Sequence, residues 1–139
     1  MTDVRISQYD LIGGAVFTRS VNDVEAVEWG AGTSQRVLTA KDNMGFAVAR
    51  TVVRKGTESK LEYRNHLEAC YCISGSGNVE DTEGNVFPVT PGVIYVLDKH
   101  DPHYLRASDH EDMELLSIFN PPIDGTEKHV LSEDGFSSY

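Results

Sequence analysis

The stretch YRNHLEACYC, residues 63–72, places a histidine and a carboxylate in what is otherwise typical of a β-strand. Because successive side chains of a strand point to opposite faces, Glu68 shares a face with His66, Cys70 and Cys72. Cysteine is usually buried in proteins, so we expect Glu68 to be buried as well. A buried carboxylate needs a cation, a set of hydrogen-bond donors or a raised pKa, which makes Glu68 the first candidate functional residue.

The spacing around Glu68 resembles the two motifs of the cupin superfamily, small jelly-roll barrels that hold a metal inside. Gly75 follows Glu68 at the E-x6-G spacing of the first motif. Tyr95 lies three residues past Gly92 of a Pro-Gly pair, where the second motif has a histidine. The two upstream histidine positions of the first motif hold other residues here, so a nitrogen ligand must come from elsewhere.

A β-hairpin is one source of that nitrogen. If residues 92–98 and 103–107 form paired strands, Tyr95 and His103 lie opposite each other on one face, with Cβ atoms roughly 5 Å apart. Together with Glu68 they form a set of two oxygens and one nitrogen, which suits iron better than copper or a structural zinc. An ordinary structural role stays open for each: a carboxylate paired with an arginine, a tyrosine at a barrel end, and a histidine in a turn.

Three longer strings resemble the ectoine synthase family, whose members are cupin-type lyases that close the ring of the compatible solute ectoine. The strings are YRNHLEACYCISGSGNVED (63–81), PGVIYVLDKHDPHYLRA (91–107) and FNPPIDGTEKH (119–129). The resemblance runs from about Trp29 to the C-terminus. It implies a ferrous iron (Fe2+) bound by Glu68, Tyr95 and His103. The implied reaction is the ring-closing dehydration of N4-acetyl-L-2,4-diaminobutyrate, which makes the protein a carbon–oxygen lyase.

The resemblance also implies which residues contact the substrate. These are Trp29, Ser34, Arg36, Thr51, Tyr63, Phe119, Glu127 and His129. Arg36 suits a bidentate pair with the substrate carboxylate. Glu127 suits the α-ammonium group, which reacts only after it loses a proton, and His129 or Tyr63 is expected to protonate the departing oxygen. Tyr63, Glu127 and His129 are therefore the candidate catalytic residues.

Simpler interpretations accompany these assignments. Trp29 and Phe119 either wall the pocket and exclude water or are plain core aromatics. Glu127 and His129 lie on a tail without periodicity, where a solvated charge cluster is the alternative. The remaining histidines, His66, His100 and His110, are expected to be structural or exposed.

Two departures from the family pattern concern the substrate. Trp29 and Arg36 are separated by a few extra residues, which puts the location of Trp29 in question. Ala49 stands at a position that is generally polar and faces the pocket. The alternative hypothesis is a non-catalytic or divergent cupin that binds an ectoine-like small zwitterion or hydrolyses it. A structural jelly roll without metal is a third hypothesis.

The elements that must position these residues are short β-strands. Strand-type runs separated by turn signals cover residues 34–40, 46–54, 69–75, 77–82, 92–98 and 113–120. Residues 21–29 are compatible with one short helix. We therefore predict an all-β protein, a cupin-type antiparallel β-barrel (jelly roll) with at most short helices, in a single domain over residues 1–139.

Composition narrows the partners. A formal net charge of −10 at pH 7 argues against binding to nucleic acid or an anionic membrane and leaves a small-molecule substrate. Cys70 and Cys72 are poorly placed for a mutual disulfide, and the sequence shows neither a signal peptide nor a membrane-spanning run. We expect a cytoplasmic protein. We also expect a homodimer, since sheet edges are commonly covered by a second copy.

Overall fold

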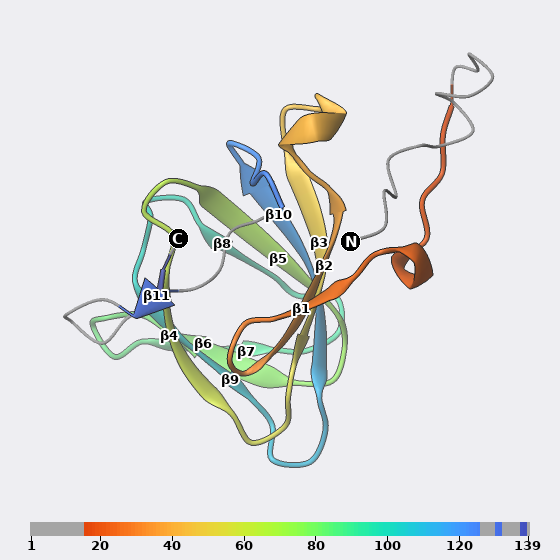
Figure 1. Ribbon diagram of the computed structural model, residues 1–139. Helices are drawn as coiled ribbons and strands as arrows, with labels where there is room; N and C mark the ends of the chain where they lie inside the picture. The colour runs from red at the N-terminus through yellow and green to blue at the C-terminus, as the bar shows by residue number, and fades with distance from the viewer. Residues whose placement is uncertain (1–15, 126–129, 132–136, 139) are drawn as a thin grey trace.

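Two six-stranded β-sheets face each other and enclose the interior of the protein (Figure 1). The computed structural model describes residues 16–125, 130–131 and 137–138. One sheet, sheet A, has the strand order β1-β2-β3-β10-β5-β8, and the other, sheet B, has the order β11-β12-β4-β9-β6-β7. Paired strands are antiparallel except β12 and β4, which run parallel.

The strands of sheet A are β1 (Ala26–Glu28), β2 (Gly32–Leu38), β3 (Ala47–Val53), β5 (Leu67–Ser74), β8 (Ile94–Leu97) and β10 (Met113–Asn120). Those of sheet B are β4 (Glu58–Glu62), β6 (Gly77–Glu80), β7 (Val86–Val89), β9 (His103–Ala107), β11 (Val130–Leu131) and β12 (Ser137–Ser138). Within the described residues the helices are two 3-10 turns, η1 (Val21–Asp23) and η2 (Ala40–Asp42). None of the described helices is long and apolar enough to cross a membrane. The predicted all-β architecture is confirmed.

Strand β10 lies between β3 and β5 and shows how the interior is divided. Its inward-facing residues, Met113, Leu115, Ser117 and Phe119, alternate with half-buried ones and are at most 3% exposed. Met113 and Leu115 belong to the apolar core, whereas Phe119 pairs in register with Glu68 of β5. The barrel is therefore apolar at one end and carries polar side chains farther along the same inner face.

The predicted pairing of residues 92–98 with 103–107 is wrong. Strand β8 pairs with β5 in sheet A, and β9 pairs with β4 and β6 in sheet B. The chain crosses from one sheet to the other at residues 98–102 instead of turning back in a hairpin. Tyr95 and His103 consequently face each other across the interior and not side by side along one sheet.

The elements that sequence patterns missed are short or carry charged residues. Only residues 21–23 of the expected helix over 21–29 are helical, as a 3-10 turn whose first amides are capped by Ser20, and β1 follows. Strand β4 has the sequence ESKLE, and β7 contains Pro88 at an edge of sheet B. Proline is typical of edge strands such as β7, and the charged residues of β4 hide the apolar alternation that marks a strand in sequence.

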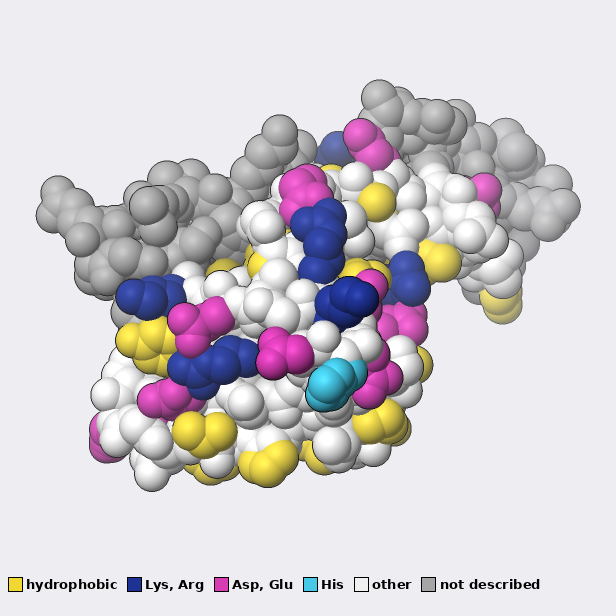
Figure 2. All heavy atoms as spheres, turned by 90° about the horizontal axis from the view of Figure 1, so that it is seen from below, with side chains coloured by type: hydrophobic (Ala, Val, Ile, Leu, Met, Phe, Trp, Pro, Cys, Tyr) yellow, Lys and Arg dark blue, Asp and Glu magenta, His cyan; other side chains and the backbone are white. Residues whose placement is uncertain are grey.

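Basic and acidic side chains are interspersed on the face seen from below (Figure 2). Ion pairs between described residues include Arg106 with Glu58 and Glu80, at 2.6 and 2.9 Å, and Arg54 with Glu28. Exposed pairs of this kind contribute little to stability, about 0–1 kcal/mol each. The described part of this face therefore alternates in sign and forms no single charged patch.

Two histidines fix the loop that carries the chain from β4 to β5. The Nδ1 atom of His100 donates to the carbonyl oxygens of Tyr63 and His66, at 2.9 and 3.1 Å. The Nδ1 atom of His66 donates to the carbonyl oxygen of Pro121, at 2.7 Å. Because carbonyl oxygens only accept, both rings carry their proton on Nδ1. His66 and His100 thus have structural roles, and His110 is exposed.

We expect His100→Ala to destabilise the protein by about 1–3 kcal/mol, because two carbonyl groups lose their donor. The substitution also leaves an alanine at a backbone φ of 58°, a left-handed conformation that costs free energy for residues other than glycine and asparagine. Urea denaturation measures the change. His110→Ala is the matched control and is expected to change the free energy of unfolding by less than about 0.5 kcal/mol. Equal effects of the two variants would contradict the anchoring role of His100.

Candidate active site

A cavity between the two sheets brings most of the predicted site residues together. Its walls include all the described residues that were predicted to bind substrate, and two predicted metal ligands: Trp29, Ser34, Arg36, Thr51, Tyr63 and Phe119, with Glu68 and Tyr95. About 400 Å³ of it is free of atoms, counting the solvent at its mouth.

His103, the first residue of β9 in sheet B, is not among the described residues that line this cavity, and with Tyr95 it lines a second one. Its ring centroid lies 6.4 Å from that of Tyr95 on sheet A and 6.4 Å from that of Tyr63, which follows β4. Glu68 lies beside Tyr95, because Cys70 pairs in register with Tyr95 and Glu68 is the next inward-facing residue of β5. The three predicted metal ligands therefore come from both sheets, and Tyr95 lies near each of the other two.

The hydrogen bonding of His103 leaves one ring nitrogen available. Its Nδ1 atom lies 2.9 Å from the carbonyl oxygen of Asp101, so Nδ1 carries the proton and Nε2 has the free lone pair. The side chain is 1% exposed, and Nε2 is buried with no hydrogen-bond partner among the described residues. A backbone carbonyl that fixes the tautomer in this way is the usual second partner of a metal-binding histidine.

Glu68 is a buried carboxyl group without a cation. It is 6% exposed, and none of the ion pairs between described residues includes it. Burial raises the pKa of Glu68 from 4.5 to about 8, and a hydrogen bond with Cys70 only partly opposes that shift. A carboxyl group in this state is protonated at neutral pH unless a positive charge is placed beside it.

Burial favours the neutral form of both the Tyr95 phenol and the His103 imidazole. Burial raises the pKa of Tyr95 well above its usual value and lowers the pKa of His103, so both favour their neutral forms. Among the described residues no three His, Cys, Asp or Glu side chains lie close enough together to hold a metal ion. A divalent cation would reverse these preferences, and the donor set fits such an ion.

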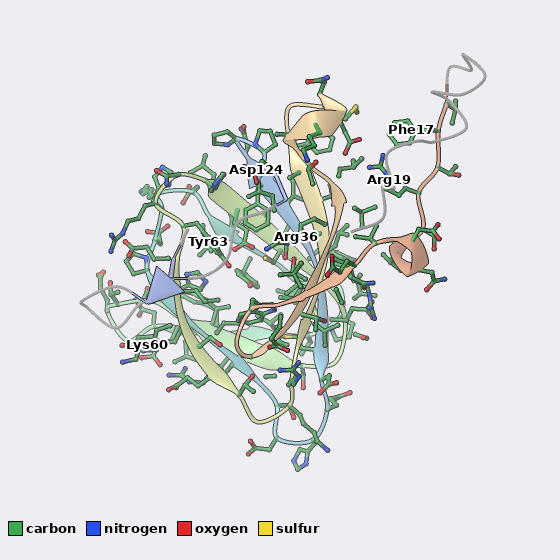
Figure 3. All side chains as sticks on the ribbon, in the orientation of Figure 1. Phe17, Arg19, Arg36, Lys60, Tyr63 and Asp124 are labelled. Carbon is green, nitrogen blue, oxygen red and sulfur yellow. The ribbon has the colours of Figure 1, made fainter. Side chains whose placement is uncertain are left out.

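Arg36, on β2 of sheet A, also lines the cavity and is 7% exposed. Its Nε atom donates to Oγ of Ser34 at 2.9 Å, and one terminal nitrogen donates to the carbonyl oxygen of Gly125 at 3.0 Å. In Figure 3 the side chains of Arg36 and Tyr63 lie between the sheets near Asp124, whereas Arg19 lies outside beside the N-terminal segment. The guanidinium group is thus held where the chain crosses the end of the barrel.

Aromatic rings line the side of the cavity next to His103. Tyr63 packs edge-on against Phe119, with ring centroids 5.5 Å apart, and His66 packs edge-on against the same ring at 6.1 Å. Phe119 is 3% exposed and Tyr63 is 6% exposed. Such a wall limits the access of water to whatever the cavity binds.

The sequence departs from the family pattern in the spacing of Trp29 and Arg36 and at Ala49, and the structure places these residues differently with respect to the cavity. Trp29 reaches the same cavity as Arg36 despite the extra residues between them. Ala49 is 1% exposed, pairs in register with Arg36 and Ser117, and is not among the described residues that line the cavity. Glu127 and His129 lie outside the described residues, so their roles stay predictions.

Two wall residues were not identified as functional from the sequence. Ser117 and Cys70 lie side by side on β10 and β5 and are 2% and 1% exposed. The sequence signal was their place on the inner face, since Ser117 alternates with Leu115 and Phe119. Both residue types are common in ordinary cores, and for that reason the pattern did not distinguish them.

The model of the ectoine synthase family matches residues 16–138 of the chain. The chain is 49% identical over 96 residues to the L-ectoine synthase of Aliivibrio fischeri (strain MJ11), which covers 69% of this chain and 75% of that protein. It is 50% identical over 109 residues to the L-ectoine synthase of Desulfatibacillum aliphaticivorans, which covers 78% of this chain and 81% of that protein.

Solved structures agree with this match. The crystal structure of ectoine synthase from P. lautus superposes with a TM-score of 0.75 at 38% identity, over 81% of this chain and 83% of that chain. The polyketide cyclase RemF from Streptomyces resistomycificus superposes with a TM-score of 0.65 at 19% identity, over 86% and 89%, and shares the fold alone. The predicted cupin-type barrel is confirmed.

The raised pKa of Glu68 predicts a pH-dependent stability of the metal-free protein. Its stabilising contribution is fully present below the unfolded pKa of 4.5 and is lost as the pH rises toward the folded pKa of about 8, because the unfolded carboxyl ionises first. Relative to wild type, Glu68→Gln should therefore gain stability over this interval, by a few kcal/mol at most. Urea denaturation in chelator at a series of pH values measures this, with exposed Glu83→Gln as control. Parallel pH curves for wild type and Glu68→Gln would contradict it.

Proposed function

The chain belongs to the ectoine synthase family, and we propose that it converts N4-acetyl-L-2,4-diaminobutyrate to ectoine at an iron site formed by Glu68, Tyr95 and His103. One observation carries the iron site: the buried Nε2 atom of His103 has no hydrogen-bond partner among the described residues, and the His103 ring faces Tyr95, next to which Glu68 has no ion-pair partner among those residues. Two hard oxygen donors with one imidazole suit iron(II). A bound ferrous ion would act as a Lewis acid on the acetamide carbonyl group.

Arg36 is the proposed partner of the substrate carboxylate. A guanidinium group has a planar set of donors that matches a carboxylate in a bidentate pair, and desolvation strengthens such a pair. Arg36 donates to Ser34 and to the carbonyl of Gly125 in this structure, and the second bond is the one that a carboxylate would replace.

Residues around the reacting groups must remove a proton from the substrate ammonium group and supply protons to the departing oxygen. The α-ammonium group must lose a proton before its nitrogen can attack, and the departing oxygen must gain protons to leave as water. The buried Tyr63 lies between Phe119 and His103, a position from which its hydroxyl group can reach the acetamide end of a bound substrate. Glu127 and His129 remain the proposed partners of the ammonium group. Trp29 and Phe119 keep the cavity dry, which favours loss of water.

Turnover tests this proposal directly. Iron-reconstituted protein is incubated anaerobically with N4-acetyl-L-2,4-diaminobutyrate, and ectoine is measured by mass spectrometry. We expect ectoine formation by wild type and none above background by Glu68→Ala, because the loss of one ligand removes the metal. The exposed-residue variant Glu83→Ala should retain wild-type turnover.

Each negative result has a separate meaning. Bound iron without turnover would contradict the proposed substrate and favour a cupin that binds a related zwitterion. Turnover by Glu68→Ala at the wild-type rate would contradict the iron site. Absence of bound iron in wild type, together with absence of turnover, would leave only the fold.

We further propose that the protein forms a homodimer through the outer face of β5 and β8. Strand β8 is the last strand of sheet A, and its outward side chains Ile94 and Val96 are 52% and 56% exposed. Ile94 pairs in register with Tyr71 of β5, which is 44% exposed, and Ile73 is 45% exposed. A contiguous apolar surface beside an open sheet edge favours association with a second copy.

Sedimentation velocity at several concentrations tests the dimer. We expect a dimer for wild type and a shift toward monomer for Val96→Glu, since the substitution buries a carboxylate in the proposed interface. Met44→Glu, at a 52% exposed methionine outside both strands, is the control and should remain dimeric. A wild-type monomer at all concentrations would refute the proposal.

A further inference from the structure

Arg19 is a buried arginine on the segment that precedes η1, and it is not among the residues that line the cavity. Its two terminal nitrogens donate to the two carboxylate oxygens of Asp42, at 3.0 and 3.1 Å, and one of them also donates to the carbonyl oxygen of Val37 at 2.8 Å. The side chains of Arg19 and Asp42 are 5% and 8% exposed, and the guanidinium group lies over the ring of Phe17, 5.1 Å from its centroid. A buried bidentate pair fixes the relative position of the segments that it joins. Arg19 therefore ties the N-terminal segment to residues 37–42.

Val37 occupies an irregularity of β2 next to Arg36. The register of β2 against β3 shifts between Arg36 and Leu38, so Val37 is the extra residue of a β-bulge. A bulge interrupts the ladder of backbone hydrogen bonds and changes the direction of neighbouring side chains, and bulges are common beside active sites. The bond from Arg19 gives the carbonyl group of Val37 a partner. Arg19 thus holds the backbone at the residue that follows Arg36.

Asp42 connects the same ion pair to the turn η2, which lies between β2 and β3 (Figure 1). One of its carboxylate oxygens accepts a hydrogen bond from the backbone N–H of Thr39 at 3.0 Å and so caps the turn. The backbone N–H of Ala40, the first residue of η2, donates to the carbonyl oxygen of Ile123 at 2.7 Å, and Ile123 is fully buried. The turn therefore holds the segment that follows β10.

The segment that follows β10 meets Arg36 at Gly125. This glycine packs closely on the residue before η2, since a Cβ atom at Gly125 would lie 3.2 Å from Cγ2 of Thr39. The carbonyl oxygen of Gly125 accepts a hydrogen bond from a terminal nitrogen of Arg36 at 3.0 Å, and Nε of Arg36 donates to Ser34. The guanidinium group is therefore held in one orientation before substrate binds, with a terminal nitrogen directed to the place that the substrate carboxylate is proposed to take.

We propose that Arg19 is a positioning residue that holds the guanidinium group of Arg36 ready for the substrate carboxylate. It acts through the bulge at Val37 and the ion pair with Asp42. This inference rests on the proposed function, in which Arg36 binds that carboxylate. Orienting a side chain in advance reduces the entropy lost when a ligand binds. The carboxylate takes no part in ring closure, so its contact is the same in the ground state and in the transition state and contributes to KM and not to kcat.

Arg50 offers a matched control in the same sheet. It lies on β3, donates to the amide oxygen of Gln35 on β2 at 3.0 Å and forms an ion pair with Glu114 on β10. Like Arg19 it joins separate segments through its guanidinium group, but neither of these partners belongs to the bulge or to η2. Replacing Arg50 therefore removes a comparable set of contacts and leaves the support of Arg36 in place.

Steady-state kinetics of the iron-loaded protein tests the effect on the substrate. We expect Arg19→Met to raise KM for N4-acetyl-L-2,4-diaminobutyrate at least about tenfold and to change kcat less than about twofold. Arg19→Lys keeps the charge but lacks the planar set of donors, so it should raise KM to a smaller extent, and it replaces the methionine variant if that variant does not fold. Arg50→Met should match the wild-type KM. An Arg19 variant with the wild-type KM would overturn the proposal, because a loss of folded protein lowers kcat alone.

NMR spectroscopy tests the positioning itself, through the rate at which the Nε–H group of Arg36 exchanges its hydrogen with solvent. The full chain is measured in chelator and without substrate. This hydrogen is bonded to Ser34 in a side chain that is 7% exposed, so it exchanges slowly, and its signal is identified by its absence from Arg36→Lys. We expect both Arg19 variants to speed its exchange at least about tenfold relative to the backbone amides of β10, and Arg50→Met to leave it unchanged.

The exchange rate separates this inference from the proposed function. A rate that is unchanged in both Arg19 variants would overturn the positioning role, whatever the kinetics show. If wild type forms no ectoine, the proposed function fails, and the exchange rate alone decides whether Arg19 positions Arg36.

Discussion

The architecture places three polar groups in the interior of the barrel, and the carboxyl group among them has no ion-pair partner within the described part of the chain. These groups are the carboxyl of Glu68, the phenol of Tyr95 and the imidazole of His103. Burial raises the pKa values of Glu68 and Tyr95 and lowers that of His103, so each group favours its neutral form. Such burial costs free energy unless a partner compensates for it. A cation bound among these groups is the compensation that their chemistry allows, since it favours the carboxylate, the phenolate and the free imidazole lone pair together.

The rest of the barrel positions Glu68, Tyr95 and His103. Sheet A provides Glu68 and Tyr95 on adjacent strands, and sheet B provides His103 at the start of β9. The backbone carbonyl of Asp101 selects the tautomer of His103, and His100 ties the crossing between β8 and β9 to the loop before β5. An apolar core at the other end, with Met113 and Leu115 fully buried, holds the two sheets at a fixed separation.

Local patterns were sufficient for some of these features and not for others. The burial of Glu68 followed from two cysteines on its face, because strand periodicity is a local property. The meeting of Tyr95 and His103 was expected for the wrong reason, since whether two successive strands pair or enter opposite sheets depends on packing between distant segments. Strand β4 escaped notice because its charged residues mask alternation. Ser117 and Cys70 were overlooked because their hydrogen bonds to neighbouring strands are visible only in three dimensions.

We propose that Glu68, Tyr95 and His103 together bind iron. X-ray absorption spectroscopy of the iron-loaded protein identifies the atoms bound to the ion. We expect a shell of oxygen and nitrogen atoms, with an imidazole contribution that disappears in His103→Gln. A sulfur neighbour at bonding distance, or an imidazole contribution that persists in His103→Gln, would contradict it.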